Sequence, residues 1–332
     1  MKCMLLRRPA PIDSLPLELA EAPDLKPGEQ DIVITIRACG VCHTDLHEVE
    51  GELEVTRLPV IPGHQIVGVV SAEGPHASRF RTGDRVGVPW LNWVCGECDY
   101  CRRGQENLCE RARFTGLHTH GGYAQSIVIH EDFAYHLPAG LDDVHTAPLL
   151  CAGVIGYRAL RLSKARGNRL GLYGFGASAH LVLQIAVHQG CQVYVYSRSD
   201  QHRKLAESLG ACWTGRAEDS PGVPLDSAII FAPAGPLVPM ALAALGRGGT
   251  CALAGIYMSP IPELNYAQSL YHERTLLSVS NSTRRDVEGL LELAARIPLR
   301  TEVETFPLDQ ANQALQLLKQ GKVRGAAVLE VS

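Results

Sequence analysis

The sequence has no excess of basic residues and no long hydrophobic run. Its 332 residues include 31 Lys and Arg against 35 Asp and Glu, which gives a formal net charge of -4. A nucleic-acid-binding protein needs a basic face, and a membrane-spanning helix needs about 20 consecutive apolar residues. The composition therefore argues against nucleic acid and membrane as partners.

Export signals and internal repeats are lacking as well. The chain opens with Met1-Lys2-Cys3-Met4 rather than with an apolar leader, and it carries no targeting motif, repeat or low-complexity tract. Its 11 cysteines are an odd number, so they cannot all pair into disulfides within one chain. We therefore expect a cytoplasmic protein with free thiols.

Four cysteines lie close together, in the pattern Cys95-x2-Cys98-x2-Cys101-x7-Cys109. This spacing lets one short loop wrap a tetrahedral Zn²⁺. The alternative, a set of short-range disulfides, would be strained at these separations. Because an ion that carries four thiolates has no open position for water or substrate, this zinc is expected to be structural.

The predicted elements change in character near residue 151. Before it, short β-rich runs between proline and glycine turns predict an antiparallel, loop-rich domain, and these runs are Asp31–Ala38, Ile66–Glu73 and Gly122–Ile129. After it, apolar strand runs alternate with helical patterns, which predicts a parallel, doubly wound sheet. The expected strands are Leu170–Tyr173, Gln192–Tyr196, Asp226–Phe231, Thr250–Ala254 and Thr275–Ser280, and the expected helices are Ala177–His188, Gln201–Leu209 and Leu237–Leu245.

The segment beyond about Arg284 continues with two more helical patterns and one strand. The helices are expected at Asp286–Ala295 and Leu308–Gln320, and the strand at Ala326–Val331. The pattern alone leaves open which domain this segment joins.

A glycine-rich turn follows the first strand of the second domain. After Leu170–Tyr173 the chain reads G-x-G-x-x-A and then enters a helical pattern, with Gly174, Gly176, Ala177, Ser178 and Ala179 in the turn. Backbone amides at such a helix start can cradle a pyrophosphate. The strand before and the helix after favour a dinucleotide site over a plain tight turn.

The end of the next strand indicates which dinucleotide the site would bind. An NAD-binding fold usually places Asp or Glu there for the ribose 2′-hydroxyl, but this chain reads Tyr196-Ser197-Arg198-Ser199. The hydroxyl of Ser197 and the guanidinium of Arg198 suit a 2′-phosphate instead, so NADP(H) is favoured. Asp200 keeps NAD open, and Arg198 could equally be an exposed loop residue.

Three scattered residues, Cys42, His64 and Cys151, suit a second metal ion. Tens of residues separate them, so their spacing cannot unite them. On this ground each is equally a core thiol or a satisfied histidine.

Five motifs together resemble the zinc-dependent medium-chain alcohol dehydrogenases over nearly the whole chain. They are GVCHTDLH at Gly40–His47, GHQ at Gly63–Gln65, the cysteine tetrad, APLLCAG at Ala147–Gly153 and the GFGASA turn. The resemblance implies an α/β plus β fold, with a GroES-like catalytic domain over residues 1–151 and a Rossmann domain over 152–283. Residues 284–332 would return to the catalytic domain, and the active site would lie between the domains.

The resemblance also implies roles for individual residues. Cys42, His64 and Cys151 would bind a catalytic Zn²⁺ with a fourth position for water or substrate, giving two zinc ions per subunit. Thr44 would be the relay hydroxyl and His47 the base that passes the proton to solvent. Asp45 would orient His64.

Further positions are assigned to the cofactor and the substrate. His43 and Arg324 resemble phosphate contacts, although both could be solvated surface charges. Trp90 resembles a wall of the substrate pocket, or it packs beneath the zinc loop. Leu53 and Ile155 would add apolar surface, and Ile256 would do so near the nicotinamide. A primary aliphatic or aromatic alcohol and its aldehyde are the expected substrates, and a homodimer or homotetramer is expected.

One residue departs from the family pattern. Gln65 follows the ligand histidine, where the family usually has Glu, so the site should be more electropositive. Two rival functions stay open. One is a zinc-free quinone or enone reductase on the same fold, and the other is a binding protein that has lost turnover.

Overall fold

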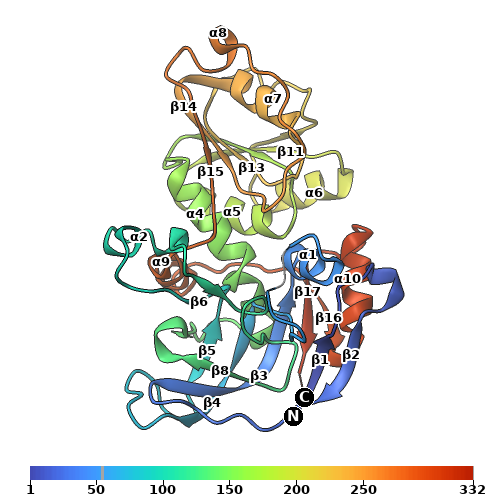
Figure 1. Ribbon diagram of the computed structural model, residues 1–332. Helices are drawn as coiled ribbons and strands as arrows, with labels where there is room; N and C mark the ends of the chain where they lie inside the picture. The colour runs from blue at the N-terminus through green and yellow to red at the C-terminus, as the bar shows by residue number, and fades with distance from the viewer. Residues whose placement is uncertain (54–55, 332) are drawn as a thin grey trace. The chain divides into compact units, whose positions relative to one another are not determined.

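The computed structural model describes residues 1–53 and 56–331. The chain forms two compact units, of which one comprises Met1–Cys151 together with the chain from Asn281 onward and the other Ala152–Ser280 (Figure 1). No helix among these described residues is long and apolar enough to cross a membrane.

The first unit is built on a seven-stranded sheet around β3 (Asp31–Val41). Along one edge β3 pairs antiparallel with β4 (Ile66–Glu73). Its other edge is shared, because β8 (Ser126–His130) pairs with residues 31–35 and β17 (Ala326–Glu330) with residues 38–41. The sheet is completed by β5 (Arg85–Val88), β9 (Tyr135–His136) and β16 (Val303–Pro307).

Three groups of elements surround this sheet. The strands β1 (Lys2–Leu6) and β2 (Leu17–Glu21) form an antiparallel pair, and the short strands β6 (Leu91–Trp93) and β7 (Arg113–Phe114) form another. The helices of the C-terminal segment are α9 (Arg284–Ala294) and α10 (Ala311–Lys319). Because β17 pairs with β3, the last strand of the chain belongs to the sheet of the first unit.

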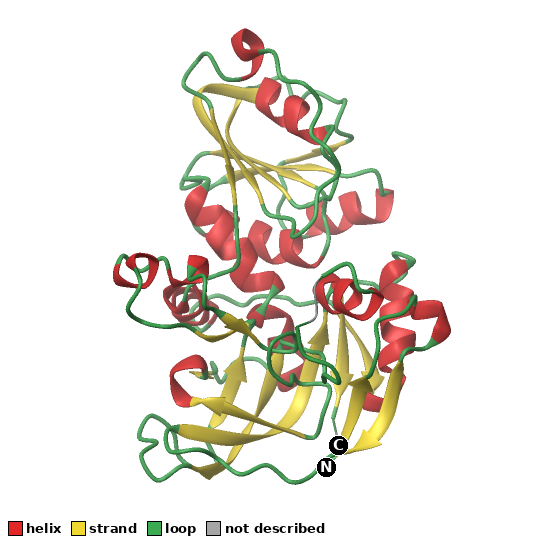
Figure 2. Cartoon of the chain, in the orientation of Figure 1, coloured by secondary structure: helices red, strands yellow, loops and turns green. Residues whose placement is uncertain are grey.

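The second unit is a six-stranded parallel sheet in the order β12-β11-β10-β13-β14-β15. Its strands are β10 (Arg169–Tyr173), β11 (Gln192–Tyr196), β12 (Trp213–Gly215), β13 (Leu225–Ile230), β14 (Leu245–Leu253) and β15 (Thr275–Ser278). Its helices are α4 (Ala152–Leu162), α5 (Ala177–His188), α6 (Asp200–Ser208), α7 (Leu237–Ala244) and α8 (Tyr266–Ser269), and they flank the sheet on both sides (Figure 2). The strand order reverses beside β10, as in a doubly wound fold. The predicted α/β architecture is confirmed.

The strands β8 and β14 differ most from their predicted bounds, and each does so for a local reason. β8 begins at Ser126 rather than at Gly122, because the amides of Gly122 and Tyr123 donate to the carbonyls of Gly63 and Pro62 instead of to the sheet. β14 begins at Leu245, five residues before the predicted start, and its register against β13 shifts between Leu225 and Ser227. This extension contains glycines, which a pattern-based prediction does not assign to a strand.

Candidate metal and cofactor sites

Cys42 lies where β3 ends and the helix α1 (His43–Glu50) begins. It is the N-cap residue of α1, and its Sγ accepts a hydrogen bond from the amide of Thr44 at 3.5 Å. In return, Oδ2 of Asp45 accepts from the amide of Cys42 at 2.8 Å. This capping box fixes a thiol and a carboxylate at the first turn of one helix.

His64 follows a turn that only glycine can make. Gly63 has φ +98°, and a Cβ there would lie 2.4 Å from the ring of Tyr123. The side chain of His64 is buried, and its Nδ1 lies 3.0 Å from Oδ1 of Asp45. Burial opposes charge on the imidazole, but the carboxylate of Asp45 and the sulfur of Cys42 together raise the pKa of His64 well above its usual value.

Cys151 brings the third side chain to this point, from the end of the 3-10 turn Ala147–Leu150. Its Sγ lies 3.8 Å from Sγ of Cys42 and 3.4 Å from Nε2 of His64. Ligands of a tetrahedral zinc ion are separated by roughly 3.8 Å for two sulfurs and 3.5 Å for sulfur and nitrogen. The thiol of Cys151 also lowers the pKa of Cys42 well below the usual thiol value, against the effect of burial. The donor set and its spacing therefore fit zinc.

The cysteine tetrad forms a second cluster within the first unit. Its four sulfurs lie within 4.8 Å of one another. Cys95 is 3.9 Å from Cys101 and 3.6 Å from Cys109, while the amide of Cys98 donates to its sulfur at 3.4 Å. The amide of Glu97 is the main cause that lowers the pKa of Cys95 to about 6, so this thiol readily becomes a thiolate. These separations also fit a tetrahedral zinc ion.

Two of the predicted proton-relay residues lie on α1 beside Cys42. Thr44 is buried, and its Oγ1 accepts a hydrogen bond from Sγ of Cys42 at 3.6 Å. His47 lies at the partly exposed side of the same helix, where its Nδ1 contacts the carboxylate of Glu52. The helix therefore carries one hydroxyl at the thiol and one imidazole toward solvent.

Trp90 contacts the candidate metal site directly. Its ring meets that of His64 edge-on, with centroids 4.7 Å apart, and it stacks on Phe114 at 5.0 Å. Leu53 is half-buried, and its amide donates to the carbonyl of His47 at 3.2 Å. Trp90 is thus placed beside a ligand candidate, while its far face packs on a residue of β7.

Two further residues lie near the site: Glu48, which the sequence analysis missed, and Gln65, which it singled out. Glu48 is fully buried on α1, and it clusters with Asp45 and His64. Gln65 is buried, and its side chain occupies the space over Gly40, where a Cβ would lie 2.8 Å from its Cδ. The signal for Glu48 was its position three residues after Asp45, which places both on one helix face.

In the second unit, the glycine-rich turn has the backbone that its sequence predicts. Gly174 has φ +88°, and its amide donates to the carbonyl of Tyr196 at 2.8 Å. Gly176 caps α5, which then carries Ala177, Ser178 and Ala179 in its first turn. A Cβ on Gly176 would meet no described atom within 4 Å. The turn therefore offers an open helix start to a phosphate, and it fits a dinucleotide.

Two arginines follow β11, an exposed one in the turn and one on α6 that is held by hydrogen bonds. Arg198 is exposed, directly after the buried Ser197. Arg203, which the sequence analysis did not single out, donates to the carbonyl of Ser197 at 2.6 Å and pairs with Asp200. The carboxylate of Asp200 is thereby engaged by Arg203.

The remaining predicted residues lie at the surface or at its edge. His43 is exposed at the start of α1. The side chain of Arg324 is 71% exposed and lies 3.6 Å from the carboxylate of Glu302. In the second unit, Ile155 is half-buried on α4 and Ile256 is 54% exposed.

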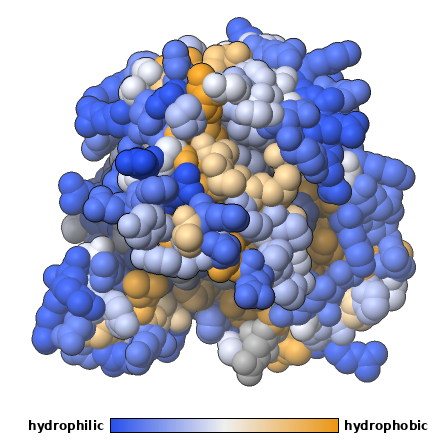
Figure 3. Space-filling view, turned by 90° about the horizontal axis from the view of Figure 1, so that it is seen from above, coloured by the Kyte–Doolittle hydropathy of each residue, from blue (hydrophilic) through white to orange (hydrophobic). Residues whose placement is uncertain are grey.

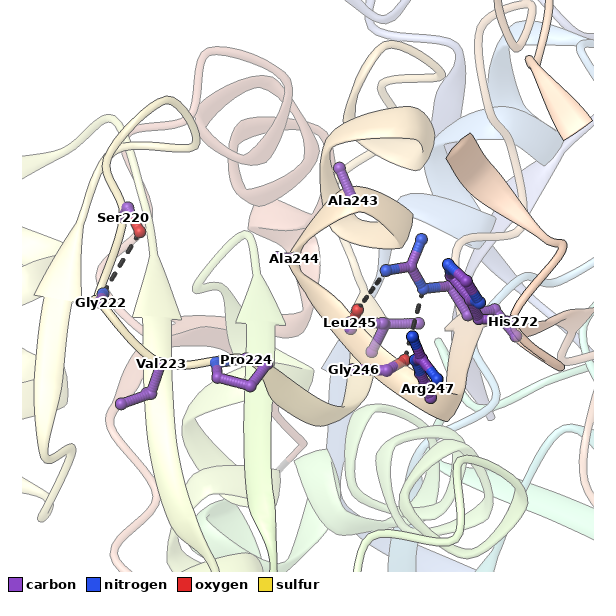
Figure 4. Close-up of a pocket in the computed structure, with 11 residues that line it drawn as sticks. Ser220, Gly222, Val223, Pro224, Ala243, Ala244, Leu245, Gly246, Arg247 and His272 are labelled. Carbon is purple, nitrogen blue, oxygen red and sulfur yellow. Dashed lines mark hydrogen bonds between the residues drawn. The ribbon is translucent and has the colours of Figure 1, made fainter. Parts of the chain in front are cut away.

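An open cavity of about 560 Å³ lies at the amino ends of β13 and β14 (Figure 4). Its lining includes Arg247, His272 and Arg274, but none of the predicted site residues. Arg274 is already engaged, because it donates to the carbonyls of Leu245 and Gln268 at 2.6 Å each. The cavity lies at the opposite strand ends from the glycine-rich turn, so it is not the cofactor site.

Comparison with known proteins agrees with this geometry. Residues 28–139 match the family model of the alcohol dehydrogenase GroES-like domain, and residues 179–296 match that of the zinc-binding dehydrogenases. The chain is 49% identical to a probable alcohol dehydrogenase, AdhA, of Mycobacterium tuberculosis (strain CDC 1551 / Oshkosh), covering 99% of this chain and 97% of that protein. The chain belongs to the zinc-binding alcohol dehydrogenase family.

Other members support this placement. An alcohol dehydrogenase of Geobacillus stearothermophilus is 36% identical over 96% of both chains. The structure of a cinnamyl alcohol dehydrogenase from Sorghum bicolor superposes with a TM-score of 0.90 at 29% identity, covering 99% of this chain and 97% of that one. The family similarity therefore spans both units of the chain.

Proposed function

We propose that this chain catalyses reversible hydride transfer between an alcohol and NAD(P), giving an aldehyde or a ketone. The observation that carries the proposal is the group of Cys42, His64 and Cys151, a donor set that fits zinc and in which Asp45 orients the imidazole. Zinc held by these residues would act as a Lewis acid that lowers the pKa of the substrate hydroxyl. A quinone or enone reductase, the rival function, would not need this zinc-assisted chemistry.

The residues of α1 would move the proton. Thr44, at the sulfur of Cys42, would accept it from the substrate hydroxyl, and His47 would release it to solvent at the edge of the helix. Trp90 lies against His64 and would contact an apolar substrate there. This supports a primary aliphatic or aromatic alcohol over a sugar or polyol, which would need more polar partners.

Several finer points belong to the same proposal. The tetrad Cys95, Cys98, Cys101 and Cys109 would hold a second, structural zinc, giving two ions per chain. At the cofactor, His43 and Arg324 would contact the pyrophosphate. Leu53 and Ile155 would line the substrate pocket, and Ile256 would lie near the nicotinamide. We place the enzyme in the cytoplasm.

We also propose a homodimer or homotetramer. Beyond Ile256, which is assigned to the cofactor, the second unit exposes large apolar side chains along one segment, namely Tyr257, Ile261, Tyr266 and Tyr271. Most of the surface visible in Figure 3 is hydrophilic, so apolar groups exposed in one segment suit a contact with a second copy. Light scattering of the purified protein would give the number of subunits.

The function is tested by zinc analysis and an alcohol assay on the purified chain. Ethanol and benzyl alcohol are oxidised with NADP⁺ and with NAD⁺ side by side. We expect two zinc ions per chain and turnover of at least one alcohol. One zinc ion with no alcohol turnover would instead identify a binding protein, and zinc-independent quinone reduction would identify the rival reductase.

NADP preference predicts a defined effect of Arg198→Ala. Loss of one charge-assisted contact to the 2′-phosphate costs about 1.5 to 3 kcal/mol, so kcat/KM for NADP⁺ should fall roughly 10- to 100-fold. The value for NAD⁺ should change less than about threefold, since NAD⁺ lacks the phosphate. Arg166→Ala, which removes an exposed arginine before β10, serves as the control. Equal losses with both cofactors would contradict the assignment of Arg198.

A further inference from the structure

The open cavity at the amino ends of β13 and β14 has a basic lining (Figure 4). Its volume is about 560 Å³, and its ionisable side chains are those of Arg247, His272 and Arg274. No acidic side chain of the described residues lines it, although the whole chain has a net charge of -4. The cavity therefore gathers positive charge in a protein that is acidic overall.

Two backbone contacts hold the three basic residues together. The amide of Gly248 donates to the carbonyl of His272 at 2.9 Å. On the other side of Arg247, Nε of Arg274 donates to the carbonyl of Gly246 at 3.3 Å. Arg247 lies between these two glycines, directly beside the segment that carries His272 and Arg274. The start of β14 and the segment before β15 thus bring three basic side chains to one cavity.

Arg274 is a cation whose partners are all neutral. Its half-buried guanidinium donates to the carbonyl of Gly246 and, at 2.6 Å each, to those of Leu245 and Gln268. Leu245 caps the carboxyl end of α7, where a helix dipole favours a positive charge. These contacts fix the guanidinium and leave its charge without a counter-ion. A guanidinium also has more N–H donors than the three that are used here.

Arg247 and His272 add donors to the same lining. Within the described parts of the chain, neither side chain forms a hydrogen bond or an ion pair. A single exposed arginine is ordinarily just solvated, so Arg247 alone would not indicate a site. Two guanidinium groups held beside one cavity repel each other, and an anion between them removes this repulsion. The lining as a whole therefore favours an oxyanion as a ligand.

We propose that this cavity is a second ligand site, which binds the phosphate group of a small molecule. Phosphate oxygens accept paired hydrogen bonds from arginine, and the imidazole of His272 can donate one more. In Figure 4 Arg247 and His272 lie on one side of the cavity and Val223 and Pro224 on the other, so an apolar group attached to the phosphate would also find a contact. The site lies at the opposite strand ends from the glycine-rich turn, and the inference does not depend on the proposed function.

Calorimetric titration of the full chain tests the site. The probes are inorganic phosphate and phenyl phosphate, each added in the presence of saturating NADP⁺ so that the cofactor site is filled. We expect both probes to bind. Tighter binding of phenyl phosphate would identify a phosphate monoester as the ligand, because its ring would contact the apolar side of the cavity. Equal affinities would identify free phosphate.

The variant Arg247→Gln removes one of the charges that the proposal needs. Phosphate binding should weaken about 10-fold or more, because a charge-assisted hydrogen bond is lost. Arg247 is exposed and lies outside the proposed catalytic machinery, so Tm and alcohol turnover should stay unchanged.

The variant Arg166→Gln is the matched control. Arg166 is an exposed arginine just before β10, at the same edge of the sheet, and it does not line the cavity. Its loss should change phosphate binding by less than about twofold, since a distant exposed charge is screened by solvent and salt.

Three outcomes would overturn the inference. If neither probe binds at about 10 mM, the cavity is not a phosphate site. If Arg247→Gln binds phosphate as tightly as the unchanged chain, the anion binds elsewhere. If Arg247→Gln and Arg166→Gln weaken binding equally, phosphate responds to the general charge of this edge and not to the cavity.

Discussion

The variant Cys42→Ser is expected to lose at least about a thousandfold in kcat/KM for alcohol oxidation while the protein stays folded. Metal ions supply several kcal/mol of charge stabilisation in such reactions, and each 1.36 kcal/mol corresponds to a tenfold change in rate. Removal of one thiolate leaves only His64 and Cys151 of the candidate ligands. Serine is itself a preferred N-cap residue, so α1 keeps the hydrogen bond that Sγ now accepts from Thr44. Kinetics and zinc analysis on the same sample check this result.

The zinc count makes this prediction specific. Cys42→Ser should retain one ion per chain, held by the tetrad, and Tm should stay close to that of the unchanged protein. Cys212→Ser removes an exposed thiol from the second unit and should keep full activity and both ions. Full alcohol turnover by Cys42→Ser would show that Cys42 is not part of the catalytic site.

Sequence periodicity predicted the second unit better than the first. The bounds of α5 and β11 agree with their predictions, because each is an apolar run set off by glycine or polar residues. In the first unit, β1 and β2 were not predicted. Their pairing joins residues 11 or more positions apart, such as Leu6 with Leu17. A local sequence pattern does not reveal such contacts. The sequence analysis missed α4, because the APLLCAG motif leads into this helix without a recognisable N-cap residue.

The candidate metal sites divide along the same line. The tetrad could be predicted because its members lie within one loop, so spacing alone brings the sulfurs together. Cys42, His64 and Cys151 come from a helix cap, a glycine turn and a 3-10 turn. Only the fold places their ligand atoms within 4.8 Å of one another. Resemblance suggested that trio, but it could not indicate Glu48, which is buried and has no hydrogen-bond partner among the described residues.

The second large effect is expected at the tetrad, in stability rather than in chemistry. Cys101→Ala should lose the structural zinc and lower Tm by roughly 10 °C, since structural zinc contributes several kcal/mol to folding. Burial and neighbouring thiols raise the pKa of Cys101 to about 12, so only metal binding readily converts this thiol to a thiolate. Differential scanning calorimetry with zinc analysis measures both quantities.

Amide hydrogen exchange shows whether the loss of stability is confined to the loop. Without zinc, the amides of residues 95–109 keep few partners beyond short turns, such as that from Arg102 to the carbonyl of Cys98 at 2.9 Å. Hydrogen exchange should therefore accelerate there first, while β3 and β4 stay protected. Cys212→Ala is the control for thiol removal. Three thiols without a fourth ligand would hold zinc in the loop less tightly. If Cys101→Ala nevertheless keeps two zinc ions and an unchanged Tm, the tetrad does not hold a structural metal.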